Sequence, residues 1–175
     1  MNHSHPPVSV IMPVRNAEKT LNRTLGTVLN QSYTNIVEII LAIGPSDDET
    51  SVLAKELGKI DPRIQIVENK TGGTARGLNL ASKLTTGEYL VRVDSHCLLP
   101  NDYVDIAVKK IKKTGAGNVG GVQMATGENG FQSAVAAAMT SKFGVGNSKF
   151  HYGGSEGPVD TVYLGVFDAA LFKEL

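Results

Sequence analysis

The chain has 175 residues, of which 41% are apolar, and this size and composition predict one domain with a substantial core. Its 17 basic and 17 acidic residues cancel, which argues against a nucleic-acid-binding protein and against a ligand held by a strong global field. A lone cysteine, Cys97, excludes an internal disulfide, and the first residues lack the basic and apolar segments of a secretory signal. We therefore expect a cytoplasmic protein with a disordered tail over residues 1–7 and a single domain over 8–175.

Short apolar segments alternate with helical patterns through the first two thirds of the sequence. Strands are predicted over 8–12, 37–43, 63–67 and 88–93, and helices over 18–30, 49–58, 72–84 and 100–113. In the helix over 49–58, the apolar residues Val52, Leu53 and Leu57 are expected to face the core.

The pattern loosens after Asn118. A glycine-rich strand over 119–125, an alanine-rich helix over 131–141, a glycine-dense loop over 144–157, a strand over 160–167 and the start of a helix over 168–175 are predicted. Strands that alternate with helices imply right-handed crossovers, so we expect an α/β fold with a mainly parallel central sheet and helices on both faces.

Polar residues follow three of the predicted strands. In an open parallel sheet, ligands bind beyond the carboxyl ends of the strands, where the segments 13–16, 44–48 and 94–96 are expected to converge. Asp94 and His96, two positions apart, can face one metal ion or one water, and this pair suits Mn²⁺ or Mg²⁺. The alternative is a carboxylate that caps a turn and a histidine satisfied by backbone groups.

Two glycine-rich segments resemble nucleotide-binding motifs in their glycine pattern but lack other features that these motifs require. The segment 115–120 reads G-x-G-x-x-G, but it follows a lysine-rich helix and leads into a strand, which is the reverse of the dinucleotide-binding order. The segment 72–77 lacks the Lys-Ser/Thr of a P-loop. Within it, Arg76 can grip a phosphate, although a surface arginine is the simpler interpretation.

An ordered set of segments resembles glycosyltransferase family 2 over nearly the whole chain. Val8 to Glu18 resembles the opening strand of this family, with its P-x-x-N-x-E turn. The remaining similar segments are 25–33, 38–50, 75–79 and 87–90, which lead to Asp94-Ser95-His96 in the place of the D-x-D metal motif.

The resemblance implies a GT-A fold, which is a Rossmann-like sandwich, with a UDP- or GDP-linked sugar donor and a divalent cation, Mn²⁺ or Mg²⁺, that bridges the diphosphate. It assigns the metal to Asp94 and His96. It assigns the nucleotide-sugar site to Pro13, Val14, Arg15, Asn16, Gly44, Arg76, Asp94 and Ser95.

The implied activity is transfer of a sugar, with inversion, to a glycan or lipid-linked acceptor in polysaccharide biosynthesis. Inversion needs a general base for the acceptor hydroxyl. Residues 162–167 resemble the strand that precedes this base, and the sequence given ends soon after it, so the catalytic residue is unknown. We expect a domain incomplete on its acceptor side, a homodimer that covers the region after Val159, and attachment of the complete protein at the cytoplasmic face of a membrane.

Two positions depart from the family pattern. Residues 43–45 replace the Asp-Asp-Gly that receives the nucleobase in many members, so the sequence does not determine whether the nucleobase is uracil or guanine. His96 replaces the second motif aspartate, as in succinoglycan-type enzymes. A nucleotidyltransferase is the competing enzyme class, but segment 13–16 lacks its glycines. A noncatalytic nucleotide-sugar-binding or assembly module is the alternative from another class.

Overall fold

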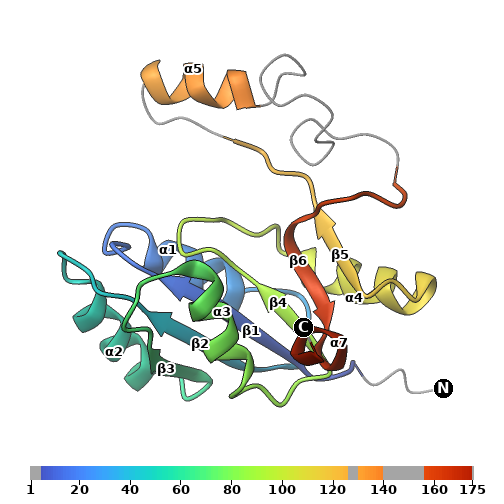
Figure 1. Cartoon of the computed structure of the whole chain (residues 1–175), viewed down its shortest axis with the longest axis horizontal. Coiled ribbons are helices and arrows are strands. Elements are labelled where there is room, and N and C mark those ends of the chain that lie inside the picture. The colour runs from blue at the N-terminus through green and yellow to red at the C-terminus, as the bar shows by residue number, and fades with distance from the viewer. Residues whose placement is uncertain (1–4, 126–129, 140–155, 175) are drawn as a thin grey trace. The chain divides into compact units, whose positions relative to one another are not determined.

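The computed structural model describes residues 5–125, 130–139 and 156–174. Strands and helices alternate as the periodicity predicts (Figure 1). The elements are β1 (Val8–Val14), α1 (Leu21–Leu29), β2 (Ile36–Ile43), α2 (Thr50–Ile60), β3 (Ile64–Glu68), α3 (Thr74–Ser82), β4 (Tyr89–Arg92), α4 (Tyr103–Thr114), β5 (Asn118–Gly121), α5 (Gly130–Met139), β6 (Tyr163–Asp168) and α7 (Ala169–Glu174).

The strands follow the order β3-β2-β1-β4-β6-β5. The pairs β1–β2, β1–β4 and β2–β3 are parallel, and β6 is antiparallel to β4. The predicted α/β fold with a mainly parallel sheet is therefore confirmed. Nearly every residue of β1 and β2 is buried, as expected for parallel strands that are covered on both faces.

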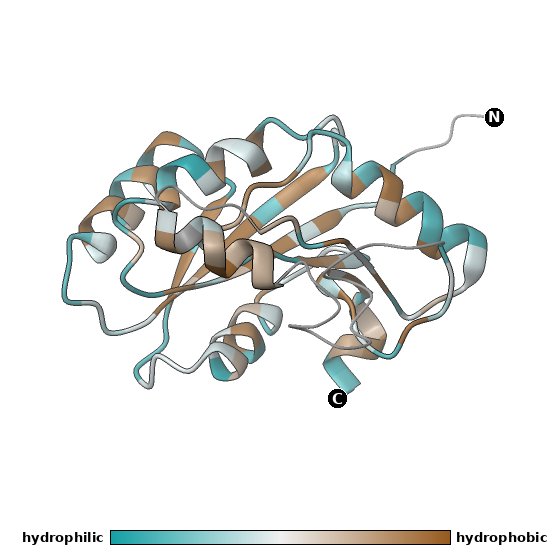
Figure 2. Ribbon diagram, turned by 90° about the horizontal axis from the view of Figure 1, so that it is seen from above, coloured by the Kyte–Doolittle hydropathy of each residue, from teal (hydrophilic) through white to brown (hydrophobic). Residues whose placement is uncertain are grey.

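Helices cover both faces of this sheet (Figure 2). Helices α1 and α2 contact each other, and the right-handed crossovers place them opposite α3. On the α3 face, Leu78 and Ala81 of α3 and Ala169 of α7 pack against β1, β2 and β4. The buried strand residues of this cluster are Ile11, Ile40, Ala42 and Leu90.

The chain divides into two compact units, whereas the sequence predicts one domain over 8–175. The larger unit comprises Met1–Asn118 and Val166–Leu175. The smaller unit is Val119–Gly165, in which β5 passes so close to β6 that a Cβ on Gly120 would lie 2.5 Å from the Cβ of Val162. Most of the predicted loop over 144–157 lies outside the described residues.

A buried carboxylate joins the amino ends of three strands in the larger unit. Glu38 of β2 is 5% exposed, and its Oε1 accepts hydrogen bonds from the Ser9 hydroxyl at 2.6 Å and from the Thr86 amide at 2.5 Å. The Thr86 hydroxyl donates to the same oxygen at 3.0 Å, and the Gly87 amide donates to Ser9 Oγ at 2.9 Å. Burial alone would raise the pKa of Glu38, but these donors outweigh it and hold the pKa below its usual value.

Two expectations about packing are wrong. Residues 5–7 are held in place rather than disordered, because the His5 ring stacks on Tyr33 and the Tyr33 hydroxyl donates to the Pro6 carbonyl at 2.7 Å. Helix α2 buries Thr50 and Ala54, and it leaves Val52 51% exposed. The prediction is therefore wrong for Val52, whereas Leu53 and Leu57 are partly buried.

Candidate nucleotide-binding cleft

A cleft of about 200 Å³ opens at the carboxyl ends of β1 and β4 in the larger unit. The crossovers leave these two neighbouring strands in opposite directions, which makes this the switch point where ligands bind in α/β sheets. Its walls come from the β1 and β4 ends and the β3–α3 connection, and they are lined by Pro13, Val14, Arg15, Asn69, Gly72, Thr74, Arg92, Asp94, Ser95 and His96.

The β4 wall alternates between buried and accessible residues. Val93, Ser95 and Cys97 are buried, whereas Arg92 and Asp94 are partly exposed and His96 is exposed. The guanidinium of Arg92 grips the Asp94 carboxylate through both oxygens, with Nε to Oδ1 at 3.0 Å and Nη2 to Oδ2 at 3.2 Å.

Helix α1 holds the loop that follows this wall. The Thr24 hydroxyl donates to the Ser95 carbonyl at 3.0 Å, and the Leu99 amide donates to Thr27 Oγ1 at 3.2 Å. The Gln31 amide group donates to the Pro100 carbonyl at 2.6 Å. Thr24 and Thr27 are three positions apart and share one side of α1, whereas Gln31 lies two residues beyond the end of the helix.

From Asn16 onward, the turn after β1 is fixed to the loop after β2. Asn16 adopts a left-handed φ of 47°, and its side chain accepts a hydrogen bond from the Asp47 amide at 3.0 Å. The buried Thr50 hydroxyl accepts from the Ala17 amide at 2.7 Å and donates to Asp48 Oδ1 at 2.5 Å.

Gly44 supports the cleft without lining it. A Cβ at Gly44 would lie 2.9 Å from the Gly72 Cα, so the loop after β2 and the β3–α3 connection approach each other closely. Gly72 has a left-handed φ of 68°, and a Cβ there would lie 3.5 Å from the Arg15 side chain. The two glycines thus let this connection form a wall beside Arg15.

The wall from the β3–α3 connection adds groups that the sequence patterns leave out. Asn69 is 2% exposed, and its amide group donates to the Gly73 carbonyl at 3.0 Å. Thr74 begins α3, and within the described part of the chain no side chain caps the first turn of this helix. Amide groups in an uncapped first turn attract anions.

Six of the predicted site residues line the cleft: Pro13, Val14, Arg15, Asp94, Ser95 and His96. Asn16 and Gly44 instead position the surrounding loops, and Arg76 is exposed in the first turn of α3 outside the lining set. Arg92 is the most informative omission, since its place two residues before Asp94 on a strand puts both side chains on one face.

The cleft supplies few donors for a metal ion. Asp94 and His96 contribute one carboxylate and one imidazole. Over residues 5–125, 130–139 and 156–174, no cluster of three or more His, Cys, Asp or Glu side chains could hold a cation. A divalent ion at this place would therefore need further ligands from water or from a bound phosphate.

The sequence matches known glycosyltransferases. The model of glycosyl transferase family 2 matches residues 9–175. The succinoglycan biosynthesis protein ExoA of Rhizobium meliloti is 35% identical over 117 residues, which are 66% of this chain and 36% of that protein. The glycosyltransferase GlyA of Streptococcus pneumoniae is 34% identical over 104 residues, which are 59% of this chain and 15% of that protein.

Solved structures show the same fold. The mannosyltransferase PcManGT from Pyrobaculum calidifontis, in complex with GDP-Man and Mn²⁺, has a TM-score of 0.62 at 27% identity and covers 69% of this chain and 36% of its own. Staphylococcus aureus TarS in complex with UDP-GlcNAc has a TM-score of 0.68 at 20% identity, and the match covers 96% of this chain and 47% of the TarS chain.

The chain spans less than half the length of these relatives. No helix in the described part of the chain is long and apolar enough to cross a membrane. The family match nevertheless covers all but the first eight residues. The chain therefore belongs to glycosyl transferase family 2.

Proposed function

We propose that this chain is the donor-binding part of an inverting, metal-dependent glycosyltransferase that uses a UDP- or GDP-linked sugar. The observation that carries the proposal is the meeting of two arginines, one carboxylate and one imidazole in a single cleft at the β1–β4 switch point. Support also comes from PcManGT, which was solved with GDP-Man and Mn²⁺.

The charges of the cleft suit a nucleotide diphosphate. Arg15 and Arg92 line it together with the first residue of α3, whereas Asp94 is the one carboxylate in the lining set. Guanidinium groups bind phosphate oxygens through paired hydrogen bonds, and the amino end of a helix favours negative charge. A dianionic or trianionic ligand would therefore be stabilised here, although the chain as a whole is neutral.

The donor set fits a divalent cation that arrives with a nucleotide. Asp94 and His96 would hold it, and phosphate oxygens and water would complete its coordination, as Mg²⁺ and Mn²⁺ commonly require. When bound, such an ion neutralises the charge that develops on the leaving diphosphate. The side chains of Arg15 and Arg92 would orient the same diphosphate from the two strand ends.

The acceptor half of the reaction is proposed from the family alone. A glycan or lipid-linked acceptor, a catalytic base, a cytoplasmic location at a membrane face and a homodimer through the region after Val159 all remain proposals. A noncatalytic nucleotide-sugar-binding or assembly module is the competing function. Such a module would bind a nucleotide sugar in the same cleft but would not catalyse transfer.

Calorimetric titration of the chain with UDP and GDP, with and without Mn²⁺, tests the donor site. Replacing Arg15 by Met is expected to weaken nucleotide binding by about tenfold or more, because a charge-assisted contact to phosphate is lost. Arg63→Met is the matched control, since Arg63 lies outside the cleft at the start of β3.

The competing outcomes differ clearly. Absence of UDP and GDP binding under every condition would overturn the proposed function. Nucleotide binding with no release of free sugar or nucleotide from either UDP-sugars or GDP-sugars would leave the noncatalytic alternative as the better description. Equal losses in Arg15→Met and Arg63→Met would show that the cleft is not the site.

A further inference from the structure

The ion pair between Arg92 and Asp94 occupies the carboxylate that the proposed metal site needs. Both Asp94 oxygens accept hydrogen bonds from the guanidinium, at 3.0 and 3.2 Å. Both residues line the cleft, with side chains 35% and 18% exposed, so water and ligands can reach the pair. The pair is thus placed where binding could rearrange it.

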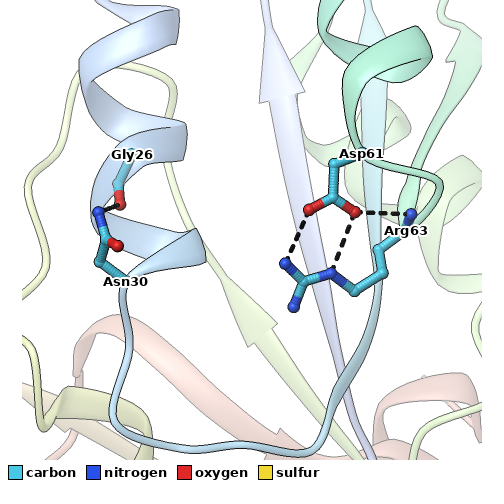
Figure 3. A network of polar contacts seen from close by, with 4 residues as sticks. All are labelled: Gly26, Asn30, Asp61 and Arg63. Atoms are coloured by element: carbon cyan, nitrogen blue, oxygen red, sulfur yellow. Dashed lines mark hydrogen bonds and ion pairs between the residues drawn. The ribbon is translucent and has the colours of Figure 1, made fainter.

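A second pair in the same chain has nearly the same geometry but lies away from the cleft. Asp61 and Arg63 are also two residues apart, with Nε to Oδ1 at 3.1 Å and Nη2 to Oδ2 at 2.7 Å (Figure 3). Their side chains are 19% and 36% exposed. The Arg63 amide also donates to Asp61 at 2.9 Å, so this pair closes the turn before β3. It provides an internal reference for a purely structural arginine–carboxylate pair.

Each member of the cleft pair could bind a ligand instead of its partner: Asp94 a cation, and Arg92 an anion. A divalent cation would take the Asp94 carboxylate, and the positive guanidinium bound to it opposes that by repulsion and by occupying the oxygens. A diphosphate offers Arg92 an alternative acceptor with the same forked geometry. One ligand therefore frees the residue that the other ligand needs.

We propose that Arg92 is a positioning residue that blocks Asp94 until a nucleotide diphosphate draws the guanidinium away, so that cation and nucleotide bind together. This inference rests on the proposed donor site. Coupling of this kind is reciprocal, because whatever the nucleotide does to the cation affinity, the cation does to the nucleotide affinity. A chain that binds the free cation weakly and the cation with nucleotide strongly would avoid holding an unpaired cation in an open cleft.

The test measures Mn²⁺ binding by the chain without nucleotide, from the electron paramagnetic resonance signal of free Mn²⁺. In Arg92→Met the affinity for Mn²⁺ alone is expected to rise about three- to tenfold, the range that loss of a partly exposed bidentate pair allows. Arg92→Lys, which keeps the charge but not the fork, should give a smaller rise. Arg63→Met should leave the Mn²⁺ affinity unchanged.

A second measurement follows UDP and GDP binding by calorimetry in the presence of a chelator. Here Arg92→Met is expected to weaken binding about three- to tenfold, because the phosphate loses its forked donor. The ratio of Mn²⁺ affinities with and without nucleotide should fall in the same variant. Thermal unfolding of all the variants checks that the fold is retained.

An unchanged or lower Mn²⁺ affinity in Arg92→Met would overturn the proposal, and so would an equal change in Arg63→Met. If Arg92 only supports the fold, its loss would lower the unfolding temperature and move neither binding constant. Failure of the wild-type chain to bind any nucleotide would count against the proposed function instead. The cation titration contains no nucleotide, so it would still decide whether Arg92 blocks Asp94.

Discussion

Replacing Glu38 by Gln should destabilise the chain by about 2 kcal/mol at neutral pH. Three donors converge on one oxygen of this 5% exposed carboxylate. Glutamine keeps an oxygen acceptor of similar shape, so the loss is the difference between charge-assisted and neutral hydrogen bonds, roughly 0.5–1 kcal/mol for each. Urea unfolding followed by circular dichroism measures this, and a midpoint lower by about 1 M is expected.

Acid should remove this difference. The pKa of Glu38 is lower in the folded chain than its ordinary value of 4.5, so the carboxylate contributes stability above that value and loses it as pH falls through the folded pKa. The gap between wild type and Glu38→Gln should therefore be full near about pH 7 and shrink below about pH 4.5. The exposed Glu56 provides a control, Glu56→Gln, with a change under about 0.5 kcal/mol. A gap that stays constant on acidification would refute the assignment.

Two further substitutions test the loops around the cleft. Gly44→Ala would place a Cβ 2.9 Å from the Gly72 backbone, so we expect the free energy of unfolding to fall by about 1–3 kcal/mol and nucleotide binding to weaken. Gly26→Ala is the control, because a Cβ there would meet no atom within 4 Å. In this helical position the free energy of unfolding should rise by about 0.5–1 kcal/mol. Thermal unfolding and calorimetry of both variants check this, and equal behaviour would contradict it. Thr50→Val removes the acceptor of the Ala17 amide and should cost about 1–3 kcal/mol in urea unfolding, so an unchanged midpoint would show that this contact is dispensable.

Periodicity was sufficient to predict β1 and β2 because these strands are buried on both faces. The apolar runs that predict strands over 8–12 and 37–43 become β1 and β2, with ends shifted by one or two residues. In α2 the same method fails for Val52, which is 51% exposed, whereas Thr50 is buried and its hydroxyl accepts a hydrogen bond from the Ala17 amide. Hydrophobic spacing carries no information about such a bond.

The candidate site was predictable where it depends on strand ends and not where it depends on loop contacts. The rule for parallel sheets located Asp94 and Arg15, and both line the cleft. Asn16 instead accepts a hydrogen bond from Asp47, which is 31 residues away, and a single sequence does not reveal such a long-range contact. Arg92 could have been found by counting back two positions along the strand from Asp94.

The contacts between α1 and the loop over 95–101 have a thermodynamic consequence for ligand binding. The Ser95 carbonyl and the Leu99 amide are already held by Thr24 and Thr27 of a regular helix. Ordering one backbone residue costs about 1–2 kcal/mol of conformational entropy, and here that cost is met during folding rather than during association. A ligand at the end of β4 would thus meet a prearranged backbone, and its affinity would not be reduced by the ordering of this loop.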